Sequence, residues 1–365
     1  MISLQKQEML DAVEPVINAV DKAPTILECS DQLLFTGTAV SAYNGTIAIT
    51  SPCDTQGLSF SVKGHDFYNF LSKASTVAVS VEVKEGVLKF KSGRTQASLK
   101  TAVTDKNYSR LIFDGDIPPF KPIPDGFIAG VGMCTLAKNT AQELRGIAVG
   151  DDGTGRSYVI ETDSNRICVY SLESSMDKFW IDGAALKTAL KVGTPTGYCI
   201  HNSWIIFEYD GGTRVAAKRK DHSSYPYADI FKCITEATEA MPLASGKLPS
   251  TLLEAVSRLS ILASRENSAV ASNLIELTFS QECLTLFASK DSGEATETIP
   301  WEEPIRGEAN SCKVWVDPAF LNEAASKSFD FKLCIHGSTP SLYVTSGAFV
   351  MLVITYTAGL YSQLL

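Results

Sequence analysis

Two segments that lie far apart in the chain carry the same amphipathic pattern. Residues 9–17 read Met-Leu-Asp-Ala-Val-Glu-Pro-Val-Ile, and residues 252–260 read Leu-Leu-Glu-Ala-Val-Ser-Arg-Leu-Ser. Both begin with an apolar residue, Leu, an acid, Ala and Val, and the second places Leu252, Val256 and Leu259 on one helix face. Agreement at this distance indicates duplicated units, so the fold has to accommodate internal repetition.

Three parts of the chain each predict a helix followed by antiparallel strands. The predicted helices cover residues 63–73, 180–191 and 316–325. The strands that follow them cover residues 77–83, 87–90 and 95–101, then 197–201, 204–209 and 213–218, then 329–335, 341–345 and 348–356. Asp182 and Asp317 stand at N-cap positions, and Pro318 stands in a first helical turn.

Proline-rich stretches at residues 117–125 and 241–249 separate these parts. A chain of 365 residues is also too long for one ordinary core. We therefore predict an α+β fold of three tandem, pseudo-equivalent domains, which comprise residues 1–121, 122–245 and 246–365.

Charge, cysteines and hydropathy restrict the class of protein. The net charge of −9 at pH 7 disfavours nonspecific coating of nucleic acid, although a local basic patch remains compatible with it. The nine cysteines include no C-x-x-C pair, which favours reduced thiols in a cytoplasmic protein. The chain opens on an amphipathic pattern, and its longest apolar run, residues 348–357, is too short for a membrane span. We expect neither a signal peptide nor a membrane segment.

One loop has the spacing of a nucleotide-binding motif. Residues 150–157 match G-x-x-x-x-G-K-[ST], except that Arg156 stands in place of Lys. Asp151 and Asp152 would repel phosphate, and the residues after the loop alternate like a strand, which favours a β-turn. A nucleotide-binding enzyme stays open as an alternative. The four histidines lack metal-ligand spacing, so we expect no catalytic residues, no metal and no cofactor.

Five pieces of the chain, in their order and spacing, match one protein family. They are residues 88–100, residues 161–169, residues 225–229, the helix from 252 with its Ile261-Leu262 continuation, and the final strand. In these pieces the chain resembles the sliding clamp of bacterial and phage replicative DNA polymerases, the beta subunit of DNA polymerase III. The resemblance implies a head-to-tail homodimer that closes into a ring, with helices lining the hole and antiparallel sheets outside.

The same resemblance implies a processivity factor without enzymatic activity. Such a ring encircles double-stranded DNA, and it binds a replicative DNA polymerase and a clamp loader through short peptides. A cytoplasmic location follows, in the host cytoplasm if a phage encodes the chain. A structural phage protein built from the same repeated domains is the second alternative.

A helix that faces sliding DNA needs basic side chains that reach phosphates without reading bases. By position in the resemblance, the expected pore residues are Lys22, Lys73, Lys138, Lys187, Lys191 and Arg258. The alternative for each residue is an ordinary solvated helix face. Glu254 and Arg258, for example, have the spacing of an i, i+4 ion pair.

The resemblance also carries over a pocket for partner peptides between the second and third domains. Its residues here are Leu144, Thr162, Asn165, Arg166 and Ile167 from the middle domain, Pro226, Ile230 and Phe231 from the loop after that domain's last strand, and Val350, Leu352, Val353 and Ile354 from the final strand. An apolar groove with a few polar groups suits a short hydrophobic peptide. Asn165 replaces a common His, Ser164 replaces a Gly, and the ending at residues 352–354 also departs from the family. These departures imply a different peptide or weak binding, and ordinary interdomain core is the alternative.

Two further expectations concern the subunit joint and the C-terminus. In the family an edge strand of the first domain pairs with the third domain, and the matching residues are Gln96, Ala97, Leu99, Ile261 and Leu262. Residues 357–365 extend beyond the family's usual end, and their final Gln-Leu-Leu resembles the start of a clamp-binding peptide. We hypothesise that this tail folds into the pocket and competes with partners; a disordered terminus is the alternative.

Overall fold

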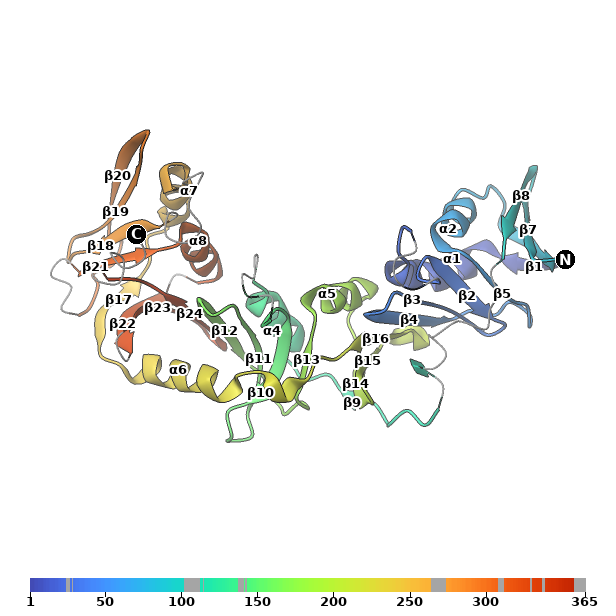
Figure 1. Ribbon diagram of the computed structural model, residues 1–365, viewed down its shortest axis with the longest axis horizontal. Helices are drawn as coiled ribbons and strands as arrows, with labels where there is room; N and C mark the ends of the chain where they lie inside the picture. The colour runs from blue at the N-terminus through green and yellow to red at the C-terminus, as the bar shows by residue number, and fades with distance from the viewer. Residues whose placement is uncertain are drawn as a thin grey trace. The chain divides into compact units, whose positions relative to one another are not determined.

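The computed structural model describes the chain except for residues 24–26, 28, 102–111, 114, 137–140, 142, 264–273, 308–311, 329, 337–338 and 358–365 (Figure 1). The described residues form two compact units. Unit 1 contains residues 1–123 and 179–222, and unit 2 contains residues 124–178 and 223–365. The predicted middle domain therefore contributes to both units, and the three-domain division stays a prediction about repeats.

One order of elements occurs three times along the chain: strand, helix, four strands, helix, three strands. The first copy is β1 (Ile2–Gln5), α1 (Lys6–Val16), β2 (Gln32–Thr36), β3 (Ala39–Tyr43), β4 (Ile47–Pro52), β5 (Ser59–Lys63), α2 (Gly64–Ser72), β6 (Ala78–Lys84), β7 (Val87–Ser92) and β8 (Thr95–Lys100). The second copy is β9 (Lys121–Pro122), α4 (Phe127–Cys134), β10 (Ile147–Asp151), β11 (Ser157–Thr162), β12 (Arg166–Ser171), β13 (Phe179–Ile181), α5 (Gly183–Val192), β14 (Gly197–His201), β15 (Trp204–Glu208) and β16 (Arg214–Lys218).

The third copy follows an additional helix, α6 (Tyr227–Glu239). Its elements are β17 (Pro242–Lys247), α7 (Leu252–Ala263), β18 (Ile275–Phe279), β19 (Cys283–Lys290), β20 (Gly293–Pro300), β21 (Cys312–Val316), α8 (Pro318–Lys327), β22 (Asp330–His336), β23 (Thr339–Ser346) and β24 (Phe349–Ile354). Helices and strands thus alternate in three equivalent sets, which confirms the predicted α+β repeat.

Helix starts follow the predicted capping chemistry. The Asp182 carboxylate accepts a hydrogen bond from the Ala184 N–H at 2.8 Å, and α5 begins directly after it. The Asp317 carboxylate accepts one from the Ala319 N–H at 2.7 Å, with Pro318 in the first turn of α8. Each carboxylate satisfies an N–H that the helix itself leaves without a partner, which fixes where the helix begins.

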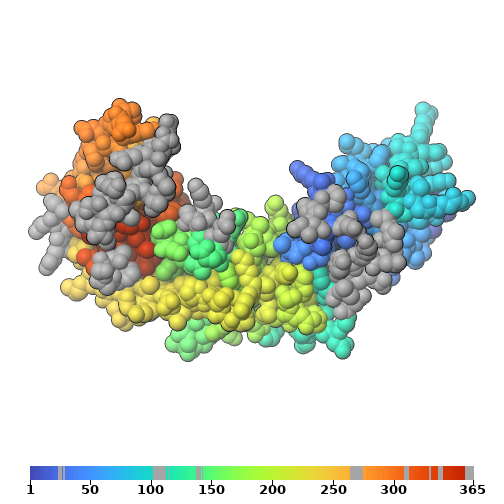
Figure 2. Space-filling model, viewed as in Figure 1, coloured from blue at the N-terminus to red at the C-terminus, as the bar shows by residue number. Residues whose placement is uncertain are grey.

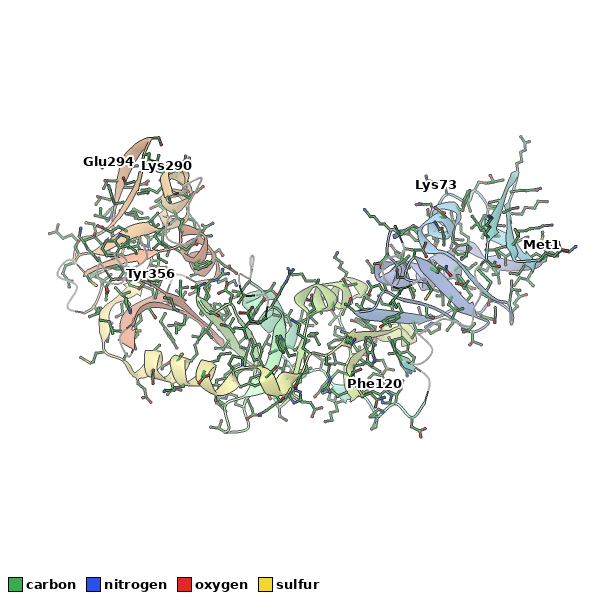
Figure 3. The ribbon with its side chains drawn as sticks, viewed as in Figure 1. Met1, Lys73, Phe120, Lys290, Glu294 and Tyr356 are labelled. Atoms are coloured by element: carbon green, nitrogen blue, oxygen red, sulfur yellow. The ribbon has the colours of Figure 1, made fainter. Side chains whose placement is uncertain are left out.

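Unit 1 contains an eight-stranded sheet of order β5-β2-β3-β4-β16-β15-β14-β9 and a four-stranded sheet of order β1-β6-β7-β8. Helices α1, α2 and α5 lie along one face of the larger sheet (Figure 1). The segment after β8 packs on its other face, where Ile112, Phe113, Ile117 and Phe120 cluster around Trp204. Phe120 is labelled in Figure 3.

Unit 2 is built in the same way. Its larger sheet runs β10-β11-β12-β24-β23-β22-β17, and its smaller sheet runs β20-β19-β18-β21. Helices α4 and α8 lie on one face of the larger sheet, and α6 lies on the opposite face (Figure 1). In each unit, therefore, the segment between two consecutive copies covers one face of the larger sheet, and the helices of the copies cover the opposite face. This segment includes residues 112–113 and 117–120 in unit 1 and α6 in unit 2.

Candidate functional site: a covered sheet face and two open sheet edges

The antiparallel pairing of β12 with β24 brings most of the predicted pocket residues together. Arg166 lies opposite Val353, Ile167 opposite Leu352, and Val169 opposite Val350. The Ile354 N–H donates to the Asn165 carbonyl at 2.9 Å, which extends the pairing to the turn before β12. Thr162 lies opposite Ile167 on the neighbouring strand.

These residues divide between two faces, because side chains alternate along a strand. We call the face that α6 covers the α6 face; it carries Ile167, Val350, Leu352 and, on neighbouring strands, Tyr343 and Cys334. The opposite face, which packs against α4 and α8, we call the α8 face. Arg166 and Val353 belong to the α8 face, where both are buried. They therefore do not line a common groove with Ile167 and Leu352.

The second half of α6 lies directly on the α6 face. Ala237 is fully buried in a cluster with Leu352 and Cys334, and Cys233, Ile234, Ala240, Ile167 and Tyr343 surround them. The Lys332 ammonium donates to the Thr238 carbonyl at 2.8 Å. The hydroxyls of Thr238 and Tyr343 lie 3.1 Å apart. The second half of α6 thus covers the part of the predicted pocket that Ile167 and Leu352 form.

The first half of α6 is held by aromatic side chains. The Tyr227 ring lies so close to Gly150 that a Cβ on Gly150 would come within 2.2 Å of it. The Tyr227 hydroxyl donates to the Val149 carbonyl at 3.1 Å. The Phe231 and Tyr158 rings have centroids 5.0 Å apart, and Ile230 is buried.

This helix corrects one expectation. Pro226, Ile230 and Phe231 were predicted in a loop, but Pro226 is the N-cap of α6 and the other two belong to its first turns. The sequence carried a signal for it, since Ile230, Cys233, Ile234 and Ala237 follow the i, i+3, i+4, i+7 spacing of a helix face. Leu144, the remaining predicted pocket residue, is half-buried in the turn before β10.

A buried ionic network occupies the α8 face. The Arg166 guanidinium contacts Asp163 at 2.5 Å and Glu323 of α8 at 2.5 Å, and its centre lies 4.0 Å from the Phe320 ring centroid. The Lys327 ammonium contacts the other Glu323 oxygen at 2.9 Å. Burial raises the pKa of the nearby Cys168 thiol to about 12 and that of Cys134 well above its ordinary value. These thiols stay protonated and act as core residues at neutral pH.

Two of the end strands in the described sheets, β8 and β20, lie in or beside the segments predicted to form the subunit joint. β8 pairs with β7, and β20 pairs with β19, and each ends its four-stranded sheet. On β8, Ala97 and Leu99 lie opposite Phe90 and Leu88 and are half-buried, while Gln96 is exposed. On α7, which packs on β19 and β20, Ile261 is 72% exposed and Leu262 is half-buried.

Solved structures share this architecture over almost the full chain. The beta chain of DNA polymerase III from Streptococcus pneumoniae superposes with a TM-score of 0.80 at 15% sequence identity, covering 98% of this chain and 99% of that chain. The DNA polymerase sliding clamp from Bacillus subtilis gives 0.78 at 16% identity, covering 98% of each chain. The DNA polymerase III beta subunit from Thermotoga maritima gives 0.74 at 12%, covering 98% and 99%. This is the sliding-clamp fold. No family model matches the sequence, and no curated protein matches it significantly.

Within the sliding-clamp fold, the predicted pore residues have different surroundings. Lys187 and Lys191 are exposed on α5, Lys73 is the exposed C-cap of α2 (labelled in Figure 3), and Lys22 is exposed beyond the first helix. Lys138 lies outside the described residues, as does the tail from residue 358 that was expected to fold into the pocket.

Acidic neighbours offset two of these charges. Arg258 ion-pairs with Glu297 of β20 and lies 3.7 Å from Glu254. Lys191 lines a cleft of about 590 Å³ that also exposes Asp11, Glu14 and Asp210. Lys22, Lys73 and Lys187 are therefore the stronger candidates for phosphate contact, because a cation already paired with a carboxylate attracts phosphate less.

The loop at residues 150–157 joins β10 to β11 as a hairpin and does not lead into a helix. The Gly153 N–H donates to Asp151 at 3.0 Å, and the Thr154 N–H donates to Asp152 at 2.9 Å. A phosphate-binding loop leaves such N–H groups free for the anion, so this loop lacks the geometry of the nucleotide-binding alternative. Among the described residues no cluster of His, Cys, Asp and Glu could hold a metal ion. None of the described helices is long and apolar enough to span a membrane.

Proposed function

We propose that this chain is a DNA sliding clamp, a processivity factor without enzymatic activity that encircles double-stranded DNA and tethers a replicative polymerase. Strand order carries the proposal. Inside the chain, the last strand of one copy pairs with the fourth strand of the preceding copy: β16 with β4, and β24 with β12. The corresponding strands left over are β8 and β20. In a pair of chains, β8 of one chain pairs with β20 of the other, in the same way as β16 pairs with β4 and β24 with β12 inside one chain.

Chemistry at these two edges supports the same pairing. The β7–β8 hairpin exposes Lys89, Lys91, Arg94 and Lys100. The β19–β20 hairpin exposes Asp291 and Glu294 at its tip, where Figure 3 labels Lys290 and Glu294. Complementary charge favours this register over pairing of two like edges. Half-exposed Leu99 and strongly exposed Ile261 supply apolar surface for burial at the joint.

Two chains joined head to tail at both ends form a closed ring of six copies. In such a ring the basic helix residues Lys22, Lys73 and Lys187 contact phosphates loosely, so DNA binding weakens as salt rises. Partner proteins, including the polymerase and a clamp loader, dock by short peptides at the predicted pocket, whose apolar residues Ile167 and Leu352 lie under the second half of α6 in the single chain. The ring acts in the cytoplasm, in that of the host if a phage encodes it.

Retention on DNA of different topology tests the proposal. The chain is assembled with a loader on a nicked circular plasmid and passed over a sizing column. We expect it to elute with the circle and to be released when a restriction enzyme linearises the plasmid, because a ring slides off a free end. Equal retention on circular and linear DNA would contradict a topological link.

A further inference from the structure

We infer that the second half of α6, residues Cys233–Ala240, is a resident occupant of the partner-binding face and that partners bind by displacing it. The inference rests on the proposed function and adds the regulation of its peptide site. Its starting observation is the cluster of Ala237, Leu352 and Cys334, in which α6 buries the apolar surface that a partner peptide needs. In Figure 2 the yellow segment that contains α6 lies on the molecular surface.

The two halves of α6 are held unequally. The first half is anchored by the Tyr227 ring against Gly150 and by the buried Ile230 side chain. The second half also has one buried residue, Ala237, but it carries no aromatic side chain; its polar contacts to the sheet are those of Thr238 with Lys332 and Tyr343 and of the Ala237 carbonyl with the Cys334 thiol. The second half therefore opens at lower cost than the first, because opening cost rises with buried contacts.

Charge on the helix also disfavours its second half. Glu236 and Glu239 lie in the last turns, where the helix dipole places partial negative charge; the last turn has no basic residue, and Lys232, one turn earlier, pairs with Glu236 at 3.9 Å. Thr235 and Thr238 are β-branched, which lowers helix propensity. Met241 follows at 86% exposure, so the chain leaves the helix through an unpacked residue.

The chain has enough length for the second half to leave while both ends stay in place. Eight helical residues span about 12 Å, whereas the same residues extended span about 26 Å. The anchor at Tyr227 and the pairing of β17 with β22 can both persist as residues 233–240 unwind away from the sheet.

The uncovered face defines the chemistry of its partner. Ile167, Leu352 and the Tyr343 ring form an apolar surface, and the Lys332 ammonium loses its Thr238 acceptor. A short peptide with apolar side chains and a carboxylate or carbonyl for Lys332 satisfies both. Since the open form is a minor population, apparent affinity falls by that fraction, and a mutation that loosens the second half raises it.

Loosening and locking the helix test this. Ala237→Gly weakens the helix in its second half, and Ala228→Gly makes the same change in the anchored first half, where Ala228 is exposed. The lock is a disulfide between Cys334 and a cysteine introduced by Ala237→Cys in a Cys233→Ser background; the two positions pack in one cluster, and loss of both free thiols on oxidation verifies the bond. The probe is a labelled synthetic peptide that begins Gln-Leu and ends in two apolar residues with a free carboxylate, and binding is followed by anisotropy.

We expect Ala237→Gly to bind the peptide about threefold to tenfold more tightly than the parent chain and Ala228→Gly to match the parent. The oxidised lock should lose binding, and reduction should restore it. Equal affinity of the oxidised and reduced lock, or no binding by the loosened chain, would overturn the inference. If Ala237→Gly fails to fold, the lock decides alone, since both of its states are one chain. Retention of the locked chain on nicked circular DNA is measured separately. Failure of retention would contradict the proposed clamp function, whereas unchanged peptide binding by the oxidised chain would contradict only the displacement of α6.

Discussion

Arg166 and Glu323 form an ion pair with 2.5 Å between nitrogen and oxygen, although 157 residues separate them in the chain. Only 1% of the Arg166 side chain and 8% of the Glu323 side chain are exposed. Asp163 and Lys327 complete the network on either side. The pair ties β12 of the second copy to α8 of the third, so it helps to hold the two copies in one sheet.

Removal of Glu323 should therefore destabilise unit 2 strongly. Glu323→Ala leaves Arg166 and Lys327 without their shared carboxylate in a buried site, and breaking a buried pair in this way costs about 3–5 kcal/mol. Denaturant unfolding followed by circular dichroism measures the loss. Arg258→Ala, which breaks an exposed pair with Glu297, is the control and should leave the midpoint almost unchanged. Equal effects of the two substitutions would show that the buried network does not hold the copies together.

Gly150 should accept no side chain. A Cβ there would lie 2.2 Å from the Tyr227 ring, so Gly150→Ala has to push away the anchor of α6, with an expected loss of about 1–3 kcal/mol. Gly132→Ala on α4 meets no atom within 4 Å and should be neutral or slightly stabilising. Thermal unfolding compares the two variants. A midpoint for Gly150→Ala as high as that for Gly132→Ala would mean that Tyr227 does not anchor the helix.

Local chemistry made much of the fold predictable. Asp182 and Asp317 predict where helices begin, because each carboxylate can accept a hydrogen bond from the N–H two residues later. This contact needs no tertiary structure. Strand alternation and the turns between strands are equally local. The fold of three repeats follows from these signals once the self-match between residues 9–17 and 252–260 is recognised.

The candidate site was less predictable, because its character depends on contacts distant in sequence. Alternation along β12 places Arg166 and Ile167 on opposite faces, but only the positions of α6 and α8 decide what covers each face. Nothing local marks Glu323 as the partner of Arg166. The apolar spacing at residues 227–239 is that of a helix. We nevertheless predicted a loop there, because the resemblance to sliding clamps indicated one.

Ile261 should control the subunit joint if the proposed ring forms. Its side chain is 72% exposed on α7 of a single chain, and Ile261→Asp would place a charge in the buried joint. We expect the variant to sediment as a monomer at concentrations where the parent chain is a dimer. Val77→Asp, a similar change at a residue that is 81% exposed, should remain dimeric. A dimeric Ile261→Asp variant would place the joint elsewhere, and a monomeric parent chain would contradict the ring itself.

Stability should fall in alkaline solution through buried thiols. Burial raises the pKa of Cys168 from its ordinary 9.0 to about 12, so the folded chain holds this proton more tightly than the unfolded chain. The stabilisation is therefore fully present below pH 9 and is lost as pH rises toward 12, by about 1.4 kcal/mol per pH unit for one such group. Cys168→Ala lowers the free energy of unfolding at every pH because it removes packing, but the variant has no thiol to titrate at this position. The difference in unfolding free energy between the parent chain and the variant should therefore shrink by roughly 1 kcal/mol between pH 8 and pH 10. Urea unfolding at both pH values measures it, with Val169→Ala on the same strand as a control whose cost should not change with pH. A cost for Cys168→Ala that is also constant would mean that the thiol ionises in the folded chain as readily as in the unfolded one.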